Sequence, residues 1–109
     1  MSWYDKIIAA HTAVTPAVRH HEKMKSERYF VWQEDSPRTD LIAESRHTER
    51  VINGSTDLFT KQEFDPWADE LEKSFERHGI AYERLGTQYE EDTGFTHVEW
   101  AWSVTDGHS

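Results

Sequence analysis

Alternating apolar and polar positions near the carboxyl end predict a strand over residues 95–104. Successive side chains of a strand point to opposite faces, so this alternation creates one apolar face. That face carries Val98, Trp100, Trp102 and Val104. The opposite face carries His97, Glu99, Ala101 and Ser103. So much aromatic area must cover something large, either helices of the same domain or a partner chain.

Two other segments show the helical period. In residues 3–14, which Ser2 precedes as an N-cap, the following side chains share one stripe: Trp3, Ile7, Ala10, His11 and Val14. Residues 65–79 begin with Asp65 as a cap and Pro66 at the first helical position, and they end at Gly79. Between these signals, the side chains that recur at helical spacing are Trp67, Leu71, Phe75 and His78. The pattern predicts two amphipathic helices.

Four more segments are typical of strands. They are the aromatic run 29–32, the short and less regular segment 40–45, the alternating segment 49–60, and residues 80–90. Residues 91–94 form a polar turn that joins 80–90 to the final strand as a hairpin. In 49–60, one face carries Ile52, Gly54, Thr56 and Leu58. Gly54 in mid-strand indicates a bulge, or a helix packed closely against the backbone.

The predicted order of elements, α-β-β-β-α-β-β, favours an α+β fold. Short polar turns favour an antiparallel (mixed) sheet of four to five strands, with both helices packed on one face. The other face is then open to water or to a neighbouring subunit. We expect a single domain over residues 1–109, with a flexible basic linker at about 16–28 and a short polar tail at 105–109.

Composition narrows the function classes. A chain of 109 residues is long enough for one core of two layers. Its formal charge of −9 argues against gripping nucleic acid, because phosphate binding needs clustered cations. The absence of cysteine excludes disulfides and thiolate metal sites. Residues 1–14 lack the pattern of a signal peptide, and no segment has the roughly 18 apolar residues that span a bilayer, so we expect no membrane partner and a cytoplasmic location by default.

Candidate chemistry is sparse. His20, His21 and Glu22, beside His47, His78 and His97, suggest zinc ligands, but their spacing matches no recognised site, and we expect no metal. The acidic run Glu90, Glu91 and Asp92 suggests a calcium loop or an acid and base pair. It lacks the ligand spacing of an EF-hand, however, and a solvated hairpin tip explains it. There is no Gly-x-Ser-x-Gly elbow and no glycine-rich phosphate loop. The sequence therefore predicts neither an enzyme nor a cofactor.

Five tryptophans in so short a chain are unusual. Tryptophan is favoured both in packed cores and at interface hot spots. Trp67, Trp100 and Trp102 are therefore candidates for a core or for a contact between subunits.

Several strings together resemble a known family. They are Tyr29-Phe30-Val31-Trp32-Gln33-Glu34-Asp35, the run from Val51 to Lys61, Asp65-Pro66-Trp67, Gly79-Ile80-Ala81 and the run from Gln88 to Gly94. Over roughly residues 3–104 the chain resembles small tail-completion proteins of long-tailed bacteriophages and prophages. These in turn are similar to tail-terminator and head-tail joining proteins. The likeness rests on order, size and fold-bearing strings, and it includes no catalytic signature.

The resemblance implies a structural role in the virion tail or neck, with assembly in the cytoplasm of the bacterial host. It implies a hexameric ring that caps the head-proximal end of the tail tube, stops tube polymerisation and offers the surface to which a filled head docks. The implied partners are further copies of the chain, the tail-tube protein and the head connector proteins. DNA would pass through without specific binding, and Glu90, Glu91 and Asp92 are candidates for an acidic lumen or interface loop.

Two alternatives stay open. One is another protein of the virion neck, such as a head-completion or connector protein. The other is a small enzyme or ligand-binding domain, with an aromatic pocket formed by Trp67, Trp100 and Trp102. The basic run 19–28 is either a loop that orders on assembly or a solvated connector.

Overall fold

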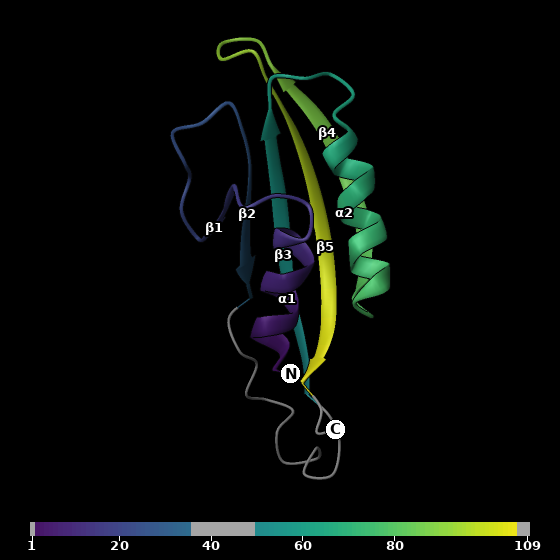
Figure 1. The fold of residues 1–109 in the computed structure, drawn as a ribbon. Helices are drawn as coiled ribbons and strands as arrows, with labels where there is room; N and C mark the ends of the chain where they lie inside the picture. Colours follow the sequence, from purple (N-terminus) through teal and green to yellow (C-terminus); the bar gives the residue numbers. More distant parts are fainter. Residues whose placement is uncertain (1, 36–49, 107–109) are drawn as a thin grey trace.

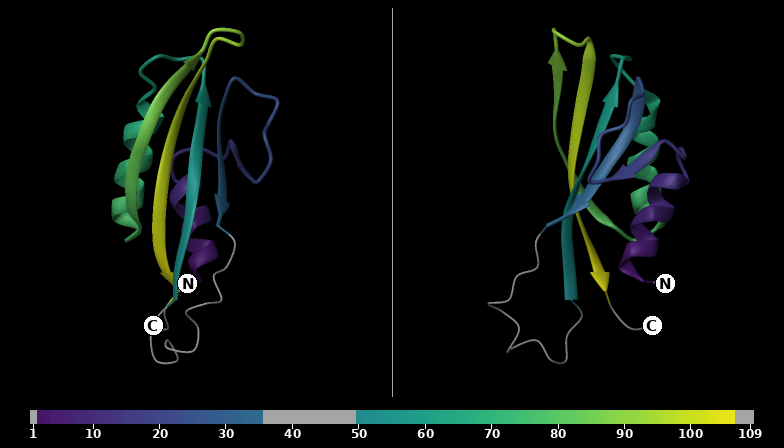
Figure 2. Two further views of the ribbon diagram at one scale, coloured as in Figure 1. Left: turned by 180° about the vertical axis from the view of Figure 1, so that it is seen from behind. Right: turned by 90° about the vertical axis from the view of Figure 1, so that its left-hand side faces the viewer.

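The computed structural model describes residues 2–35 and 50–106 (Figure 1). Its elements follow the order α-β-β-β-α-β-β. They are α1 (Trp3–Thr12), β1 (Val18–His20), β2 (Arg28–Glu34), β3 (Arg50–Thr60), α2 (Pro66–Arg77), β4 (Ala81–Glu90) and β5 (Phe95–Asp106). Both helices lie on one side of the sheet, as the edge-on view in Figure 2 shows. The predicted α+β fold is confirmed.

The five strands form one mixed sheet in the order β1-β2-β3-β5-β4. The β1–β2 pair is parallel, and the other pairs are antiparallel. The long pair β3–β5 runs from Arg50 opposite Asp106 to Thr60 opposite Thr96 and forms the centre of the sheet. Strand β4 continues into β5 through the predicted hairpin, whose turn contains Gly94 with φ of 76°.

The predicted signals for the two helices are found in the structure. The Ser2 hydroxyl accepts a hydrogen bond from the Asp5 amide at 3.2 Å, and α1 ends at Thr12, two residues before the predicted end. At the start of α2, the Asp65 carboxylate accepts from the Trp67 amide at 2.9 Å. Gly79 follows α2 in the left-handed conformation, with φ of 71°, which suits a residue without a Cβ.

Asp65 also ties α2 to the sheet. Its buried carboxylate accepts from the Arg28 guanidinium of β2 and, at 2.7 Å, from the Thr60 hydroxyl of β3. Burial alone would raise the pKa of Asp65, but the hydrogen bonds from Arg28, Thr60 and the Trp67 amide outweigh it and lower the pKa. The Arg28 guanidinium lies 3.7 Å from the centre of the Trp67 ring. One carboxylate thus joins two strands and a helix start.

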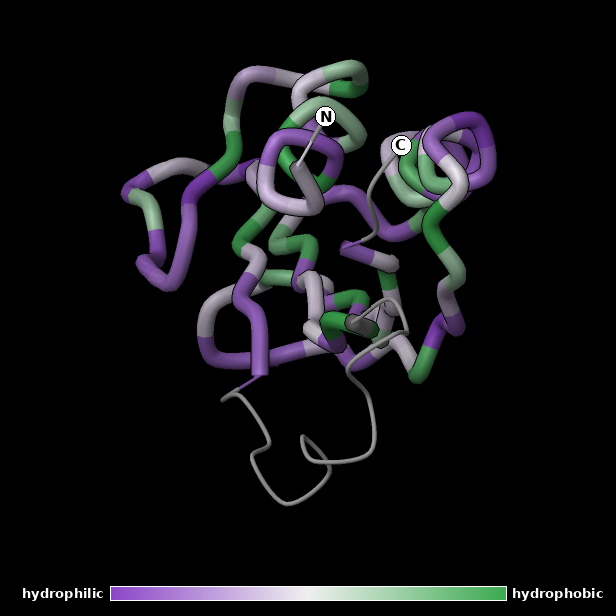
Figure 3. The backbone as a smooth tube through the Cα atoms, turned by 90° about the horizontal axis from the view of Figure 1, so that it is seen from below, coloured by the Kyte–Doolittle hydropathy of each residue, from purple (hydrophilic) through white to green (hydrophobic). Residues whose placement is uncertain are grey.

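The main core lies between the helices and the sheet, the two layers that Figure 3 shows one above the other. The sheet contributes Phe30, Trp32, Leu58, Val98, Trp100, Trp102 and Val104, and the helices contribute Ile7, Ala10, Ala68, Leu71 and Phe75. The predicted alternation in β5 is confirmed, because its four apolar residues are buried. The aromatic area of this strand covers helices of its own domain.

His11 lies at the centre of this core and is fully buried. Its Nδ1 lies 2.8 Å from the Ile7 carbonyl oxygen, which can only accept, so Nδ1 carries the proton. Its Nε2 then accepts from the Thr56 hydroxyl at 2.8 Å. The Thr56 oxygen in turn accepts from Trp102 Nε1 at 2.9 Å. This chain of bonds links α1, β3 and β5 and leaves no polar side-chain atom of its members unpaired.

The predicted linker at 16–28 is partly wrong. Residues Val18–His20 form β1, and the register pairs Val18 with Phe30 and His20 with Trp32. Three residues are too few to show a period, which is why the sequence pattern did not indicate a strand. Beyond β1, Met24 packs on a second small cluster of Tyr29, Val31 and Phe59 on the face of the sheet away from the helices. This part of the chain therefore covers one end of that face.

Three other predicted boundaries need comment. The short strand at 40–45 and residue 49 of the strand at 49–60 lie outside the described residues. The polar tail predicted at 105–109 is wrong at its start, because β5 continues through Asp106 and pairs with β3 there. Residues 107–109 also lie outside the described part of the chain.

Gly54 packs directly beneath Trp102. A Cβ added at Gly54 would collide with the Trp102 ring and with the carbonyl oxygen of Gln33. The prediction of a bulge or a helix at Gly54 is therefore wrong, and a side chain of the neighbouring strand takes the space. The irregularity in strand pairing lies elsewhere, between Arg84 and Gly86 of β4.

The buried His11 predicts a pH dependence of stability. Burial lowers the pKa of His11 from 6.5 to about 4, despite its bond to the Ile7 carbonyl. Between these two values the unfolded chain binds a proton that the native protein does not. The neutral, buried His11 therefore contributes its full stabilisation above pH 6.5. As the pH falls toward 4, the free energy of unfolding decreases by about 3 kcal/mol. Urea unfolding from pH 7.5 to 4.5 measures this loss.

The matched control is His11→Gln, which lacks the titrating group. We expect it to be less stable than the wild type at pH 7.5 but to show a much flatter dependence on pH. The pKa values of Asp65 and of Glu34, which accepts from His20, are also lowered. Their stabilisation is lost only as the pH falls below the usual carboxyl values of 3.8 and 4.5, which lies outside the range from pH 7.5 to 4.5. Equal slopes for the two proteins would contradict the assignment to His11.

The contact between Gly54 and Trp102 predicts a second effect. Gly54→Ala should lower the free energy of unfolding by about 2 kcal/mol or more, because the backbone and the Trp102 ring both have to move. Gly86→Ala is the control, since a Cβ there meets no atom within 4 Å. Urea midpoints measure both variants, and equal midpoints for the two variants would contradict the packing argument.

Candidate functional site

The face of the sheet away from the helices is mostly polar where β3, β4 and β5 form it. We call this surface the open face. Side chains directly opposite each other on paired strands share a face, so the register defines its members. Beside the apolar Phe59, this face includes Asn53, Ser55, Asp57, Glu83, Gln88, His97, Glu99, Ala101 and Ser103. These residues are half-buried or exposed, in contrast to the buried residues that alternate with them on β5.

The one imidazole on the open face is already paired. His97 Nε2 lies 2.7 Å from Asp57 Oδ1, and the His97 ring stacks on Phe59 with centroids 4.6 Å apart. Both contacts hold the ring against the sheet. His97 was expected to be an ordinary strand residue, and the structure gives it a fixed carboxylate partner instead. The pairing needed the β3–β5 register, which the sequence pattern does not supply.

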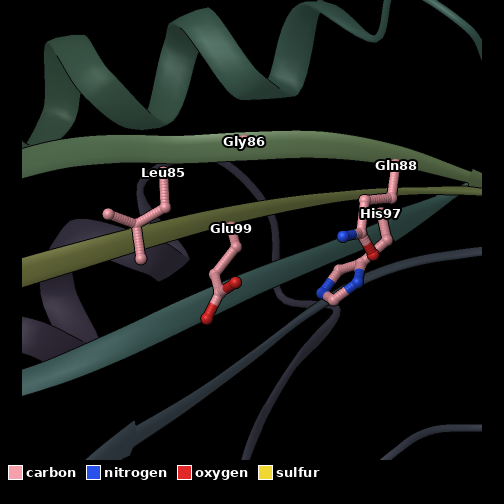
Figure 4. Close-up of a pocket in the computed structure, with 5 residues that line it drawn as sticks. All are labelled: Leu85, Gly86, Gln88, His97 and Glu99. Carbon is pink, nitrogen blue, oxygen red and sulfur yellow. The ribbon is translucent and has the colours of Figure 1, made fainter.

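A small hollow lies on the open face beside the bulge of β4 (Figure 4). It is lined by Leu85, Gly86, Gln88, His97 and Glu99, and its volume is about 100 Å³. Sites for small molecules usually have volumes of about 300–1,000 Å³. This hollow therefore has room for a few water molecules or for the tip of one side chain from another protein.

Strand β4 is an edge of the sheet and pairs with β5 alone in the described part of the chain. Its first half is tied to α2. Tyr82 donates to Glu76 at 2.6 Å, a bond that raises the pKa of Tyr82 to about 12, and Arg84 donates to Glu72 at 2.6 Å and to Asp69 at 3.1 Å. Its second half, from Leu85 onward, makes no such ties in the hydrogen bonds of the described residues, and it leaves Leu85 and Tyr89 more than half exposed.

The hairpin of β4 and β5 projects past the ends of both helices, at the top of Figure 1. Glu90, Glu91 and Asp92 lie at its tip and are exposed, as predicted for a solvated turn. The turn is well held, because the Thr93 hydroxyl donates to Glu90 at 3.1 Å and Lys61 Nζ donates to the Thr93 carbonyl. Lys61 Nζ also lies 4.4 Å from the centre of the Phe95 ring. The tip thus presents three carboxylates on a braced turn.

The three candidate tryptophans belong to the core. Trp100 is fully buried and donates to Glu72 at 2.8 Å, and Trp102 is 2% exposed. Trp67 is half-buried between Phe30, whose ring is 5.8 Å away, and Arg28. Trp102 borders a shallow groove with Asn53, Tyr82 and Glu83, but it offers that groove almost no surface. The aromatic pocket considered from the sequence is therefore not formed by these residues.

The remaining histidines fall into separate surroundings. His78 follows the end of α2 and donates from Nδ1 to the Ser74 carbonyl at 2.8 Å. His20 and His21 meet Glu34 of β2, and these three form the one grouping of possible metal ligands in the described residues. The sequence pattern groups these two histidines with their neighbour Glu22. It does not identify Glu34 as their partner, because nothing in the local pattern shows that the chain returns along β2. His47 and His108 lie outside the described residues.

No protein-family model matches the sequence, and no curated protein matches it significantly. Within residues 2–35 and 50–106, neither helix has the length and apolar character needed to cross a bilayer. The expected family therefore stays a prediction that rests on the strings quoted above.

Proposed function

We propose that the protein is a tail-completion protein of a long-tailed bacteriophage or prophage. It forms a ring on the head-proximal end of the tail tube, ends tube polymerisation and presents the surface to which the head joins. One structural observation supports this role most directly. The free half of edge strand β4 continues into a braced hairpin with an acidic tip that extends beyond the body of the domain. Such a subunit has separate surfaces for its neighbours and for what lies along the ring axis.

The sheet order suits a ring. Closed rings above the dimer use a head-to-tail contact, in which one patch of each subunit meets a different patch of the next. Strands β1 and β4 lie at opposite ends of the sheet, so its two edges face opposite directions. The exposed half of β4 offers unpaired backbone groups for strand addition. The β1 side of the next subunit, or a segment close to it, is the corresponding surface.

The charge distribution suits a passage for DNA. The open face carries Asp57, Glu83 and Glu99, and the hairpin tip adds three further carboxylates. The whole chain has a formal charge of −9. Carboxylates that line a channel repel phosphates at short range and leave few cations to hold them. We therefore place the tip, and the open face behind it, on the side of the ring that faces the lumen.

Deletion of the gene from the parent phage or prophage tests this role. In negative-stain electron microscopy of the lysate we expect filled heads lying apart from tails, and tails of uncontrolled length. The wild-type gene supplied on a plasmid should restore joined particles. Normal infectious particles after deletion would overturn the proposal. Tails of normal length without heads would move the protein to the head-completion or connector class.

Complementation with surface variants tests the edge strand in the same experiment. Leu85→Lys with Tyr89→Lys places two charges on the free half of β4, where charge opposes edge-to-edge pairing, and it should fail to restore joined particles. Phe64→Lys is the matched control, because Phe64 is 89% exposed and lies between β3 and α2. Equal rescue by both variants would exclude the free half of β4 as the contact.

The acidic tip generates a separate prediction. Changing Glu90, Glu91 and Asp92 together to lysine should slow DNA ejection from assembled particles, more strongly at low salt, because the new cations attract the passing phosphates. Receptor-triggered ejection, followed by the fluorescence of a DNA-binding dye, measures the rate. The exposed sites should leave the near-ultraviolet circular dichroism unchanged. Unchanged ejection kinetics would remove these residues from the lumen.

A further inference from the structure

Two adjacent histidines at the end of β1 converge on one carboxylate of β2. His20 Nε2 lies 2.6 Å from Glu34 Oε1, and His21 Nε2 lies 3.5 Å from the same oxygen. One potential ligand atom from each residue lies within 4.8 Å of the others. The three side chains are partly exposed, so an ion in solution can reach them.

The backbone adopts an uncommon conformation to bring these groups together. Consecutive side chains of an extended strand point to opposite sides, which would separate His20 from His21. His21 instead has φ of 69°, the one positive value among the described residues other than glycine. Its amide donates to the Trp32 carbonyl at 3.0 Å. The centroid of its ring lies 3.9 Å from the centroid of the His20 ring. A left-handed residue with a side chain costs on the order of 1 kcal/mol, which the surrounding contacts must offset.

Aromatic neighbours hold the first histidine in place. The His20 ring stacks on Trp32, with centroids 4.0 Å apart and an interplanar angle of 17°. Tyr4 of α1 contacts the same ring edge-on at 5.7 Å. A ligand whose ring is already oriented loses less conformational freedom on binding an ion. His20 and Glu34 also come from two paired strands, so their separation is set by the sheet.

We propose that His20, His21 and Glu34 bind a divalent first-row transition-metal ion, with Zn²⁺ as its representative. Two imidazoles and a carboxylate are a donor set that suits Zn²⁺, Co²⁺ and Ni²⁺. Ligand atoms of a tetrahedral site with bonds of about 2.0–2.1 Å lie about 3.3 Å apart. The 3.5 Å between His21 Nε2 and Glu34 Oε1 is already close to this spacing. The 2.6 Å between His20 Nε2 and Glu34 Oε1 lengthens when the ion replaces the proton of their hydrogen bond. Water completes the coordination.

Binding at this site does not require tail assembly, because the isolated chain contains all three ligands. Its effect would be to clamp the short edge strand β1 to the end of β2. A three-residue strand has few backbone bonds of its own, so a metal bridge there adds a constraint that the parallel pairing lacks. The proposal concerns binding and assigns no catalysis to the ion.

The test uses the full chain, dialysed against EDTA and then into metal-free buffer at pH 7.5. Isothermal titration with zinc chloride should show one ion bound per chain. In a nitrogen-15 spectrum of the histidine rings, the resonances of His20 and His21 should shift on titration, and those of His11 should not. Cobalt chloride should add visible absorption bands typical of four- or five-coordination. No saturable binding, or shifts confined to other histidines, would overturn the proposal.

Variants separate this cluster from other zinc-binding groups on the chain. Glu34→Gln keeps the size of the side chain and a hydrogen-bond acceptor, and His21→Asn suits the left-handed backbone, so both should fold. Each should weaken binding by about tenfold or more. His78→Asn is the control, because His78 lies outside the cluster and should leave the affinity unchanged. Undiminished binding by Glu34→Gln and His21→Asn would assign the zinc to another site.

Discussion

The packing of this protein depends on how one buried imidazole is satisfied. His11 sits where α1 meets the sheet, and a buried polar group without a partner costs about 1–3 kcal/mol. Its two ring nitrogens are used by the backbone of its own helix and by Thr56, which also receives the Trp102 indole. This arrangement admits one rotation of α1 and one register of β3 against β5. Gly54 then supplies the space into which the Trp102 ring fits.

The elements with long periods or strong end signals could be predicted from the sequence. Helix α2 has a cap, a proline and a glycine at its ends, and β5 alternates between half-buried and buried positions from Phe95 to Val104. Strand β1 could not be predicted, because its three residues carry no period and its partner lies beyond a connecting loop. The predicted end of α1 at residue 14 and the predicted start of the polar tail at residue 105 are wrong. Pairing and capping, rather than composition, decide where an element ends.

The candidate surfaces also divide into those that could be predicted from the sequence and those that could not. The acids of the hairpin tip are neighbours in sequence, so the turn signal was enough to place them together. The His97–Asp57 pair, the Arg28–Asp65 pair and the grouping around Glu34 each join segments that are far apart along the chain. Such groupings follow from sheet register, which a single sequence specifies only through the complete fold. For the same reason the tryptophans proved to be core residues, although their number alone was compatible with an interface.

The pairing of β3 with β5 has a consequence for how the chain folds during synthesis. The central pair of the sheet joins a strand from the middle of the chain to the last strand, with α2 and β4 made between them. Contacts between such distant segments form slowly, because a long loop must close before they stabilise anything. Until β5 has left the ribosome, β3 lacks this partner and Thr56 lacks its bond from Trp102. Folding of the sheet therefore waits for β5, and a truncation that removed this strand would take out the centre of the sheet rather than trim its edge.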